Sequence, residues 1–191
     1  MAITRELVKS VRGGISENPY FSIARLAEDL HAPEADIVIS LPLSMRVRAS
    51  VDELGALWRE LPTWQPLRVT MTPMPVLSGT GPVICRGTLD KSLQDDNVLG
   101  QYVPDITALQ RRGIGSAWFI TNALLSEESY SLRLYDNRGR RLLSVFLCMD
   151  KHGRPYPESL EAFEKSRKRF GVRPTPKMHC KGCGKCTCGG R

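Results

Sequence analysis

Four cysteines lie within nine residues near the C-terminal end of the sequence, at Cys180, Cys183, Cys186 and Cys188, and His179 directly precedes them. The two-residue gaps let neighbouring thiolates turn onto one centre, and the glycines between them permit the tight turns. Nearby lysines lower the pKa of the thiols, which favours the thiolate form that a metal binds. The spacing therefore predicts a soft-metal site with these five residues as candidate ligands.

Several species fit such a site. Four thiolates suit tetrahedral Zn²⁺, Cu⁺ or an iron–sulfur cluster. The last gap, between Cys186 and Cys188, is shorter than the pairs of a structural zinc site, so a redox thiol pair and no specific role are alternatives. Residues 173–176 contain two prolines and predict a stiff, extended spacer. A site attached through a spacer favours delivery, sensing or docking over catalysis.

The positive charge of the chain is concentrated in its C-terminal segment, which also holds the clustered cysteines. The formal net charge is +7. Residues 165–191 hold nine lysines and arginines and no acid, so the remaining 164 residues carry 18 basic and 20 acidic groups, a net charge of −2. The basic segment predicts either a solubilising tail or a weak anionic partner.

Nucleic acid is not an expected partner, because a nucleic-acid-binding domain shows a basic patch within its fold. Residues 22–42 predict two helices that resemble half of a helix-turn-helix. The second helix offers only Glu34, Asp36 and Ser40, which are not the residue types of a DNA-reading helix. We therefore expect both helices to cap a sheet.

The sequence predicts a cytoplasmic protein. No apolar run approaches the ~20 residues that a membrane helix needs, and the N-terminal residues do not resemble a signal peptide. A cytosolic setting argues against a disulfide framework. Cys85 and Cys148 lie in apolar, strand-like segments and are predicted to be buried core thiols.

Hydrophobic periodicity divides the chain into helices first, then strands, then a helix. We expect a leader over residues 1–20, where Gly13 and Gly14 break any long helix, an α+β domain over 21–170 and the basic Cys-rich tail over 171–191. Apolar residues recur at helical spacing in 22–30, 33–42, 52–61 and 157–170. Alternation predicts strands at 67–72, 83–88, 116–121, 130–135 and 142–147. The last two form a hairpin, and the pattern predicts an α+β fold with an antiparallel sheet.

With these elements in place, the chain resembles the cytosolic haem-utilization carriers of the HutX/ChuX type, relatives of the HemS/ChuS haem-handling proteins. Three blocks carry the resemblance, at residues 22–42, 61–69 and 116–139. It implies a saddle-like antiparallel sheet flanked by helices, and a homodimer that holds haem in a cleft and hands it to an acceptor protein. It implies no reaction for the carriers.

The resemblance also suggests a haem site. Tyr102 matches an aromatic position of the family and is a candidate iron ligand, and Arg111 and Arg112 are candidates for the haem propionates. The family's loop histidine and the arginine before the hairpin have no counterpart in this sequence. His31 and His152 are expected to face solvent.

Three hypotheses about function follow from these observations. The first is a haem-binding carrier with a metal-binding tail. The second is the same fold without haem, acting as a metal-binding adaptor or metallochaperone. The third, an enzyme of haem metabolism, is disfavoured because the sequence shows no paired carboxylates, nucleophile–base arrangement or phosphate loop.

Overall fold

The computed structural model describes residues 3–18, 21–71, 87–88, 106–111, 113–121 and 130–172. The strands are β1 (Arg46–Ala49), β2 (Leu67–Met71), β3 (Gly87–Thr88), β4 (Ile114–Thr121), β5 (Tyr130–Asp136), β6 (Arg141–Leu147) and β7 (Gly171–Val172). The helices are α1 (Arg5–Glu17), α2 (Ile23–Asp29), α3 (Glu34–Ser40), α4 (Leu54–Glu60), α6 (Ile106–Arg111) and α7 (Pro157–Phe170), with 3₁₀ turns η1 (Leu43–Met45) and η2 (Leu61–Trp64).

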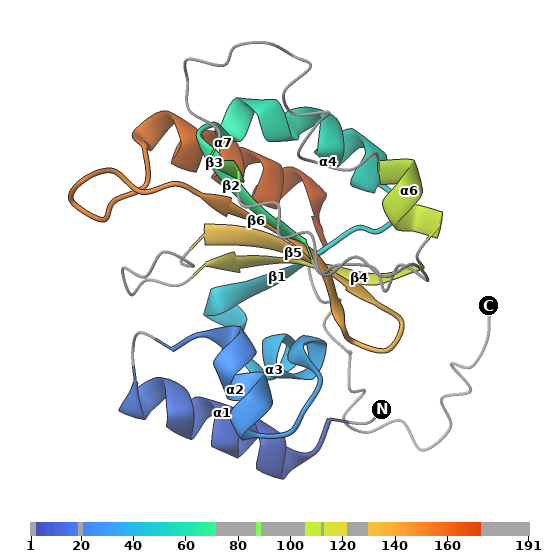
Figure 1. Cartoon of the computed structure of the whole chain (residues 1–191), viewed down its shortest axis with the longest axis vertical. Coiled ribbons are helices and arrows are strands. Elements are labelled where there is room, and N and C mark those ends of the chain that lie inside the picture. Colours follow the sequence, from blue (N-terminus) through green and yellow to red (C-terminus); the bar gives the residue numbers. More distant parts are fainter. Residues whose placement is uncertain are drawn as a thin grey trace, which may run out of the picture.

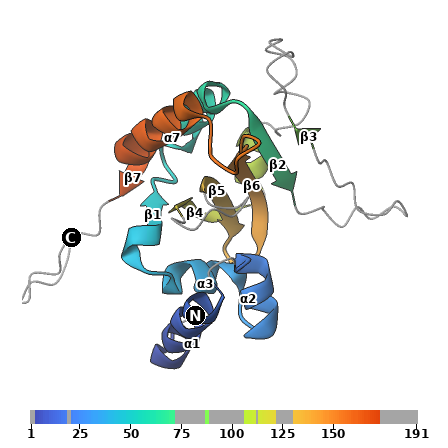
Figure 2. The same cartoon turned by 90° about the vertical axis from the view of Figure 1, so that its left-hand side faces the viewer.

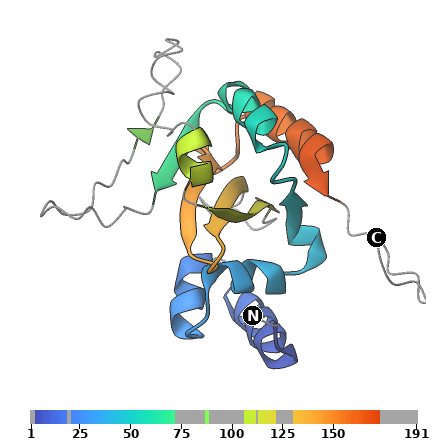
Figure 3. The same ribbon diagram turned by 90° about the vertical axis from the view of Figure 1, so that its right-hand side faces the viewer.

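In this part of the chain, seven antiparallel strands form one sheet in the order β3-β2-β6-β5-β4-β1-β7. Helices α4, α6 and α7 lie on one side of the sheet, and α1, α2 and α3 lie on the other (Figure 1). Figures 2 and 3 show the same two helical groups from the sides. The predicted α+β class with an antiparallel sheet is therefore confirmed.

One face of the sheet is apolar and carries the larger core. Trp64 of η2 meets Phe163 of α7 edge-on, with ring centroids 5.1 Å apart, and Phe119 of β4 lies 5.5 Å from Phe163. All three side chains are fully buried. Burial of each such side chain stabilises the fold by roughly 1.5–3 kcal/mol. Leu54 and Leu57 of α4 join the same cluster, so α4 and α7 are held on this face.

A second, smaller core holds α1, α2 and α3 together. Val11, Ile37 and Val38 are fully buried there, and Trp118 and Tyr135 bring the sheet into the same cluster. The N-terminal helices are thus packed on the second face of the sheet. The expectation that two helices over residues 22–42 cap a sheet agrees with this arrangement.

Helix α1 corrects one expectation. Gly13 and Gly14 do not break a helix, because residues 5–17 are helical throughout. The glycines have a packing role instead: a Cβ at Gly14 would lie 2.9 Å from Leu26 Cδ2. The small residue lets α1 approach α2, and Val11 anchors α1 in the second core.

The predicted hairpin is confirmed. Strands β5 and β6 pair from Ser131↔Phe146 to Tyr135↔Arg141, and Gly139 in the turn between them has φ +78°. The predicted helix starts after Ser22 and Pro33 are also confirmed, although Ser22 makes no side-chain capping bond.

The structure differs from the sequence prediction at β1, and describes the strand predicted at residues 83–88 only in part. Strand β1 was not predicted, although it joins β4 to the short edge strand β7. Of the strand expected at 83–88, residues 87 and 88 pair with β2, and residues 83–86, including Cys85, lie outside the described residues. Within the described ranges, no helix combines the length and apolarity that a bilayer crossing requires.

Candidate functional site: an arginine-rich sheet face

The second face of the sheet carries arginines where the first carries apolar residues. In β5, Arg133 alternates with Leu132 and Leu134, which lie in the apolar core. Pairing across the strands places other arginines and two aromatic residues on the side of Arg133. We call this surface the arginine face; it comprises Arg46, Arg48, Arg68, Arg133, Arg141, Trp118 and Phe146.

Phe146 of β6 is the centre of one half of the arginine face. The guanidinium carbon of Arg68 lies 4.8 Å from the centroid of its ring, and that of Arg133 lies 5.3 Å away. Phe146 is buried and Arg133 is fully buried. Cation–π contacts of this kind contribute on the order of 0.5–2 kcal/mol each. The site therefore places positive charge against a buried aromatic ring.

The buried charge of Arg133 is balanced by a carboxylate from the N-terminal helices. Nη1 of Arg133 donates to Oε1 of Glu34 at 2.9 Å, and the Tyr135 hydroxyl donates to the same oxygen at 3.2 Å. Nε of Arg133 donates to Ser131 Oγ at 3.3 Å. Burial raises the pKa of Tyr135 far above its ordinary value, although the nearby charge of Arg133 opposes this. Tyr135 is therefore a neutral hydrogen-bond donor.

Trp118 of β4 lies in the other half of the arginine face. The guanidinium carbon of Arg46 lies 5.2 Å from its ring centroid, and Nε of Arg46 donates to the Leu41 carbonyl at 3.0 Å. Burial lowers the pKa of Arg46. The arginine therefore links β1 to the end of α3 as well as stacking on the indole.

Some buried polar atoms on this face have no hydrogen-bond partner among the residues that the structure describes. They are Nε1 of Trp118 and Oγ of Ser144, and Nε of Arg141 on the same face is a third. Trp118 and Ser144 are the cross-strand neighbours of Arg133, one on each side. Since buried polar groups are normally paired, this row is suited to a ligand that brings acceptor oxygens.

Of the three haem-site residues predicted from the sequence, Arg111 lies among the described residues. Arg111 is exposed on the last turn of α6, where its Nε donates to the Thr107 carbonyl at 3.4 Å. Helix α6 packs into the apolar core through Leu109, so the described contacts do not bring Arg111 to the arginine face. Tyr102 and Arg112 lie outside the described residues.

The candidate metal ligands His179, Cys180, Cys183, Cys186 and Cys188 also lie outside the described residues. In the part of the chain that is described, no group of three or more His, Cys, Asp or Glu side chains is placed to hold a metal ion.

The remaining histidines and the core cysteine have clear positions. His31 and His152 are exposed, as expected. Cys148, which follows β6, is half-buried rather than fully buried as predicted. Burial raises the pKa of its thiol, although Arg68 acts in the opposite direction. Cys148 is therefore a protonated thiol at the rim of the arginine face.

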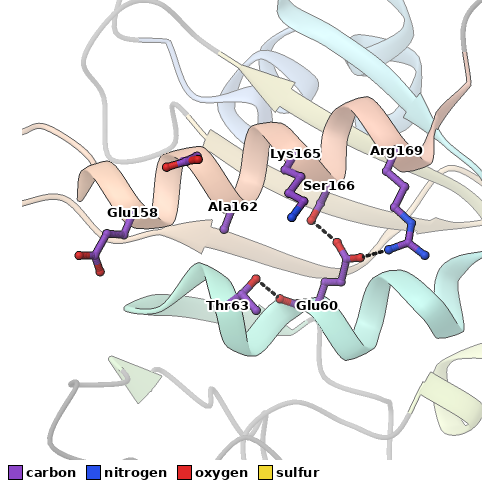
Figure 4. A pocket seen from close by; sticks show the side chains of 8 residues that line it. Glu60, Thr63, Glu158, Ala162, Lys165, Ser166 and Arg169 are labelled. Atoms are coloured by element: carbon purple, nitrogen blue, oxygen red, sulfur yellow. Dashed lines mark hydrogen bonds and ion pairs between the residues drawn. The ribbon is translucent and has the colours of Figure 1, made fainter.

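A groove of about 380 Å³ runs between α7 and η2 (Figure 4). Its central carboxylate is already engaged. Glu60 accepts hydrogen bonds from Ser166 Oγ at 2.6 Å and from Arg169 Nη1 at 2.6 Å, as the dashed lines in Figure 4 show. Ser166 Oγ in turn accepts from Trp64 Nε1 at 3.1 Å. This network links η2 to α7 and has a structural role.

The arginine face was missed at the sequence level, although a signal for it is present. Arg46, Arg68 and Arg133 each occur in a strand with an apolar residue on the following position. An arginine in such an alternation must point away from the apolar face. Three of them in strands of one sheet indicate a cationic face.

Comparison with known proteins gives a match at the level of the fold. No family model matches the sequence, and no curated protein matches it. The heme-binding protein ChuX has a TM-score of 0.56 and 15% sequence identity, and the match covers 84% of this chain and 98% of ChuX. The chain has the ChuX fold. This agrees with the resemblance drawn from the three sequence blocks.

A longer protein contains the ChuX fold as well. PhuS, a heme-binding protein from Pseudomonas aeruginosa, matches in its apo form with a TM-score of 0.52 and 16% identity. The match covers 88% of this chain but 46% of PhuS. The ChuX fold of this chain therefore corresponds to about half of PhuS.

Proposed function

We propose that this chain is a cytoplasmic haem-binding carrier and that the arginine face contacts the haem. The observation that carries the proposal is Phe146, flanked by the guanidinium groups of Arg68 and Arg133 on a ChuX fold. Guanidinium groups are the partners that the carboxylate side groups of a porphyrin require.

The described residues fit the carboxylate end of haem. Ser144 Oγ is buried beside Arg133 without a described partner and is suited to donate to a carboxylate oxygen. The iron end is different: His31 and His152 are exposed on turns, and the Tyr135 hydroxyl is bound to Glu34. We therefore keep Tyr102 as the proposed iron ligand and Arg112 as a proposed propionate partner, whereas Arg111, on α6 beside the apolar core, is not proposed to contact a haem on the arginine face. When bound, haem supplies the iron centre that the carrier transports.

We also propose that the carrier acts as a homodimer. The match covers 88% of this chain but 46% of PhuS. PhuS is therefore about twice as long as the segment that matches this chain. Two copies of this chain would supply the equivalent of both parts of PhuS. An acceptor protein that takes up the haem completes the proposal.

The test is a titration of the purified full-length chain with haem, followed by absorption spectroscopy. We expect a saturable shift of the Soret band at one haem per chain or per dimer. Arg68→Ala should weaken binding about tenfold, the effect of losing one charge-assisted contact. Arg59→Ala is the matched control, since Arg59 is exposed on α4, on the opposite side of the sheet.

Tyr102→Phe tests the iron ligand separately. A changed Soret spectrum with Tyr102→Phe supports the assignment, and an unchanged spectrum removes Tyr102 from the site. If Arg68→Ala and Arg59→Ala bind haem equally well, the arginine face is not the haem surface.

A second proposed function belongs to the Cys-rich tail, residues 171–191. The spacing of Cys180, Cys183, Cys186 and Cys188 favours a soft metal ion or an iron–sulfur cluster. The chain would then act as a metal-binding adaptor or metallochaperone on the same fold. Elemental analysis of the full chain and of a variant ending at Thr175 tests it: one equivalent of metal that is lost on truncation supports this role.

A further inference from the structure

Arg46 and Arg48 of β1 flank the same indole ring of β4. Arg48 lies directly opposite Trp118 in the antiparallel pairing, and Arg46 lies diagonally across from it, opposite Ile120. The guanidinium carbon of Arg46 is 5.2 Å from the centroid of the Trp118 ring. Successive residues on one face of a strand are about 6.7 Å apart, so one small ligand can contact both arginines. We call Arg46, Arg48 and Trp118 the β1 site.

The two arginines of the β1 site carry positive charge without a carboxylate to balance it. Among the residues that the structure describes, neither forms an ion pair, and their one side-chain hydrogen bond runs from Arg46 Nε to the Leu41 carbonyl at 3.0 Å. Burial lowers the pKa of Arg46, because it disfavours the charged form. An anion beside Arg46 would offset both this desolvation and the repulsion between the two like charges.

Arg46 is also held in one orientation before any ligand binds. Its guanidinium group stacks on Trp118 and its Nε is bonded to Leu41, which leaves both Nη groups without a partner in the described part of the chain. Paired N–H donors of a guanidinium group bind an oxyanion in a forked geometry. A side chain that is already oriented loses less entropy on binding. Arg48 is exposed, so the β1 site is reached from solvent.

Trp118 adds an unpaired donor to the β1 site. Its indole N–H is buried and has no hydrogen-bond partner within the described ranges, and the whole side chain is 7% exposed. Buried N–H groups are normally paired, and a bound oxyanion would bring an acceptor to this one. Because the N–H is shielded from bulk solvent, it reports on changes at the β1 site rather than on dissolved salt.

We propose that the β1 site binds an oxyanion, the carboxylate or phosphate group of a ligand, through the guanidinium groups of Arg46 and Arg48. The site is separate from the haem contacts proposed at Phe146, because three strand spacings, about 14 Å, lie between β1 and β6. Figure 2 shows β1 and β7 toward the edge of the sheet that lies away from β6. The inference therefore goes beyond the haem proposal and does not depend on it.

The test is a titration of the isotope-labelled, full-length chain with sodium acetate and, separately, with sodium phosphate. Each anion replaces chloride at constant ionic strength, so that general screening stays the same. The readout is the indole N–H resonance of Trp118, which is identified by its absence in Trp118→Phe. We expect this resonance to move downfield and to saturate at millimolar concentrations. Saturation with acetate alone identifies a carboxylate site, with phosphate alone a phosphate site, and with both a general oxyanion site.

Arginine variants connect the shift to the β1 site. Arg48→Ala removes one charge and should weaken anion binding about tenfold, the effect of losing one charge-assisted contact. Arg46→Lys keeps the charge but loses the forked donor geometry, and should weaken binding by a similar factor. Arg59→Ala is the control and should bind as the unaltered protein does, since Arg59 is exposed on α4, on the opposite side of the sheet.

Two results overturn the proposal. One is a Trp118 resonance that stays in place, or moves in proportion to concentration without saturating, with both anions. The other is a saturable shift that Arg48→Ala leaves unchanged. Because Arg48 is exposed, Arg48→Ala decides the question even where Arg46→Lys does not fold. Haem takes no part in these titrations, so failure of the β1 site and failure of the haem-carrier proposal are distinguishable.

Discussion

Asp136 and Asp150 each close a turn in the same way. Oδ1 of Asp136 accepts from the backbone N–H groups of Arg138 and Arg140, and Oδ1 of Asp150 accepts from those of His152 and Arg154. Burial would raise the pKa of Asp136, but the bonds from Arg140 and Arg138 outweigh it, and the pKa lies below its ordinary 3.8. The Asp136 carboxylate therefore stabilises the turn while it is ionised.

Asp136→Asn should lower the free energy of unfolding by about 1 kcal/mol at neutral pH, because the ion pair with exposed Arg140 and the charge-assisted bonds are lost. A carboxyl with a depressed folded-state pKa contributes stability above its unfolded pKa and loses it as the pH falls through the folded value. The deficit of Asp136→Asn relative to the unaltered protein should thus be constant from pH 5 to 8 and shrink below pH 3.8. Urea unfolding at several pH values measures it; a deficit that persists unchanged at pH 2.5 contradicts the account.

Ser166 is the second residue whose loss is readily predicted. Its hydroxyl accepts from the indole N–H of fully buried Trp64 and donates to Glu60. Ser166→Ala leaves the indole N–H buried without an acceptor, which costs about 1–3 kcal/mol. Ser10→Ala, an exposed position on α1, is the control. Equal melting temperatures for the two variants would show that the indole finds another acceptor.

The burial of Arg133 illustrates what sequence reasoning lacks at this scale. The alternation with Leu132 and Leu134 does place Arg133 on the second face. Nothing local, however, indicates that the second face is covered, or that the balancing carboxylate lies 99 positions earlier at Glu34. A long-range pair of this kind exists only in the folded chain.

At the scale of elements, Gly139 and Gly153 form a matched pair. Both have positive φ, +78° and +71°, and both occupy the fourth position of an Asp-x-x-Gly-Arg turn. A Cβ at Gly153 would meet nothing within 4 Å, whereas a Cβ at Gly139 would lie 3.0 Å from Pro33 Cβ. A substitution at Gly153 therefore shows the cost of the backbone conformation alone, whereas a substitution at Gly139 adds the steric contact with the start of α3.

Gly153→Ala should cost about 1–2 kcal/mol, the penalty for a left-handed conformation. Gly139→Ala should cost about 1–3 kcal/mol more, because overpacking pushes α3 away from the hairpin. Chemical denaturation of both variants gives the difference. Equal losses would mean that the start of α3 yields without cost, despite the hydrogen bond from Ala35 N to the Gly139 carbonyl at 3.2 Å.

Elements with local signals were predicted well from the sequence. The β5–β6 hairpin and helix α7 have continuous periodicity and clear end signals, so their positions are confirmed. Strand β1 has four residues, too few for a pattern, and it depends on β4 and β7 for pairing. Helix α1 was missed because the glycine rule treats Gly14 as a helix breaker, whereas contact with Leu26 requires a small residue there.

At the scale of the whole molecule, the two cores of the described residues end with Phe170. Removal of residues 176–191 should therefore leave the melting temperature of the domain unchanged within about 1 °C, because no described core residue follows Phe170. Differential scanning calorimetry of the full chain and the variant ending at Thr175 provides the comparison. A truncated protein that unfolds several degrees earlier would show that the Cys-rich tail stabilises the domain.

The different chemistry of the two sheet faces also guards against misfolding. A slip of one residue between β5 and β6 would turn Arg133 into the apolar core and bring Leu132 and Leu134 to the arginine face. The misregistered hairpin would bury a guanidinium without Glu34 and lose two leucines from the core. The buried charge and the lost apolar contacts both disfavour the misregistered pairing, so Arg133 helps to specify the register of β5 and β6, independently of any ligand.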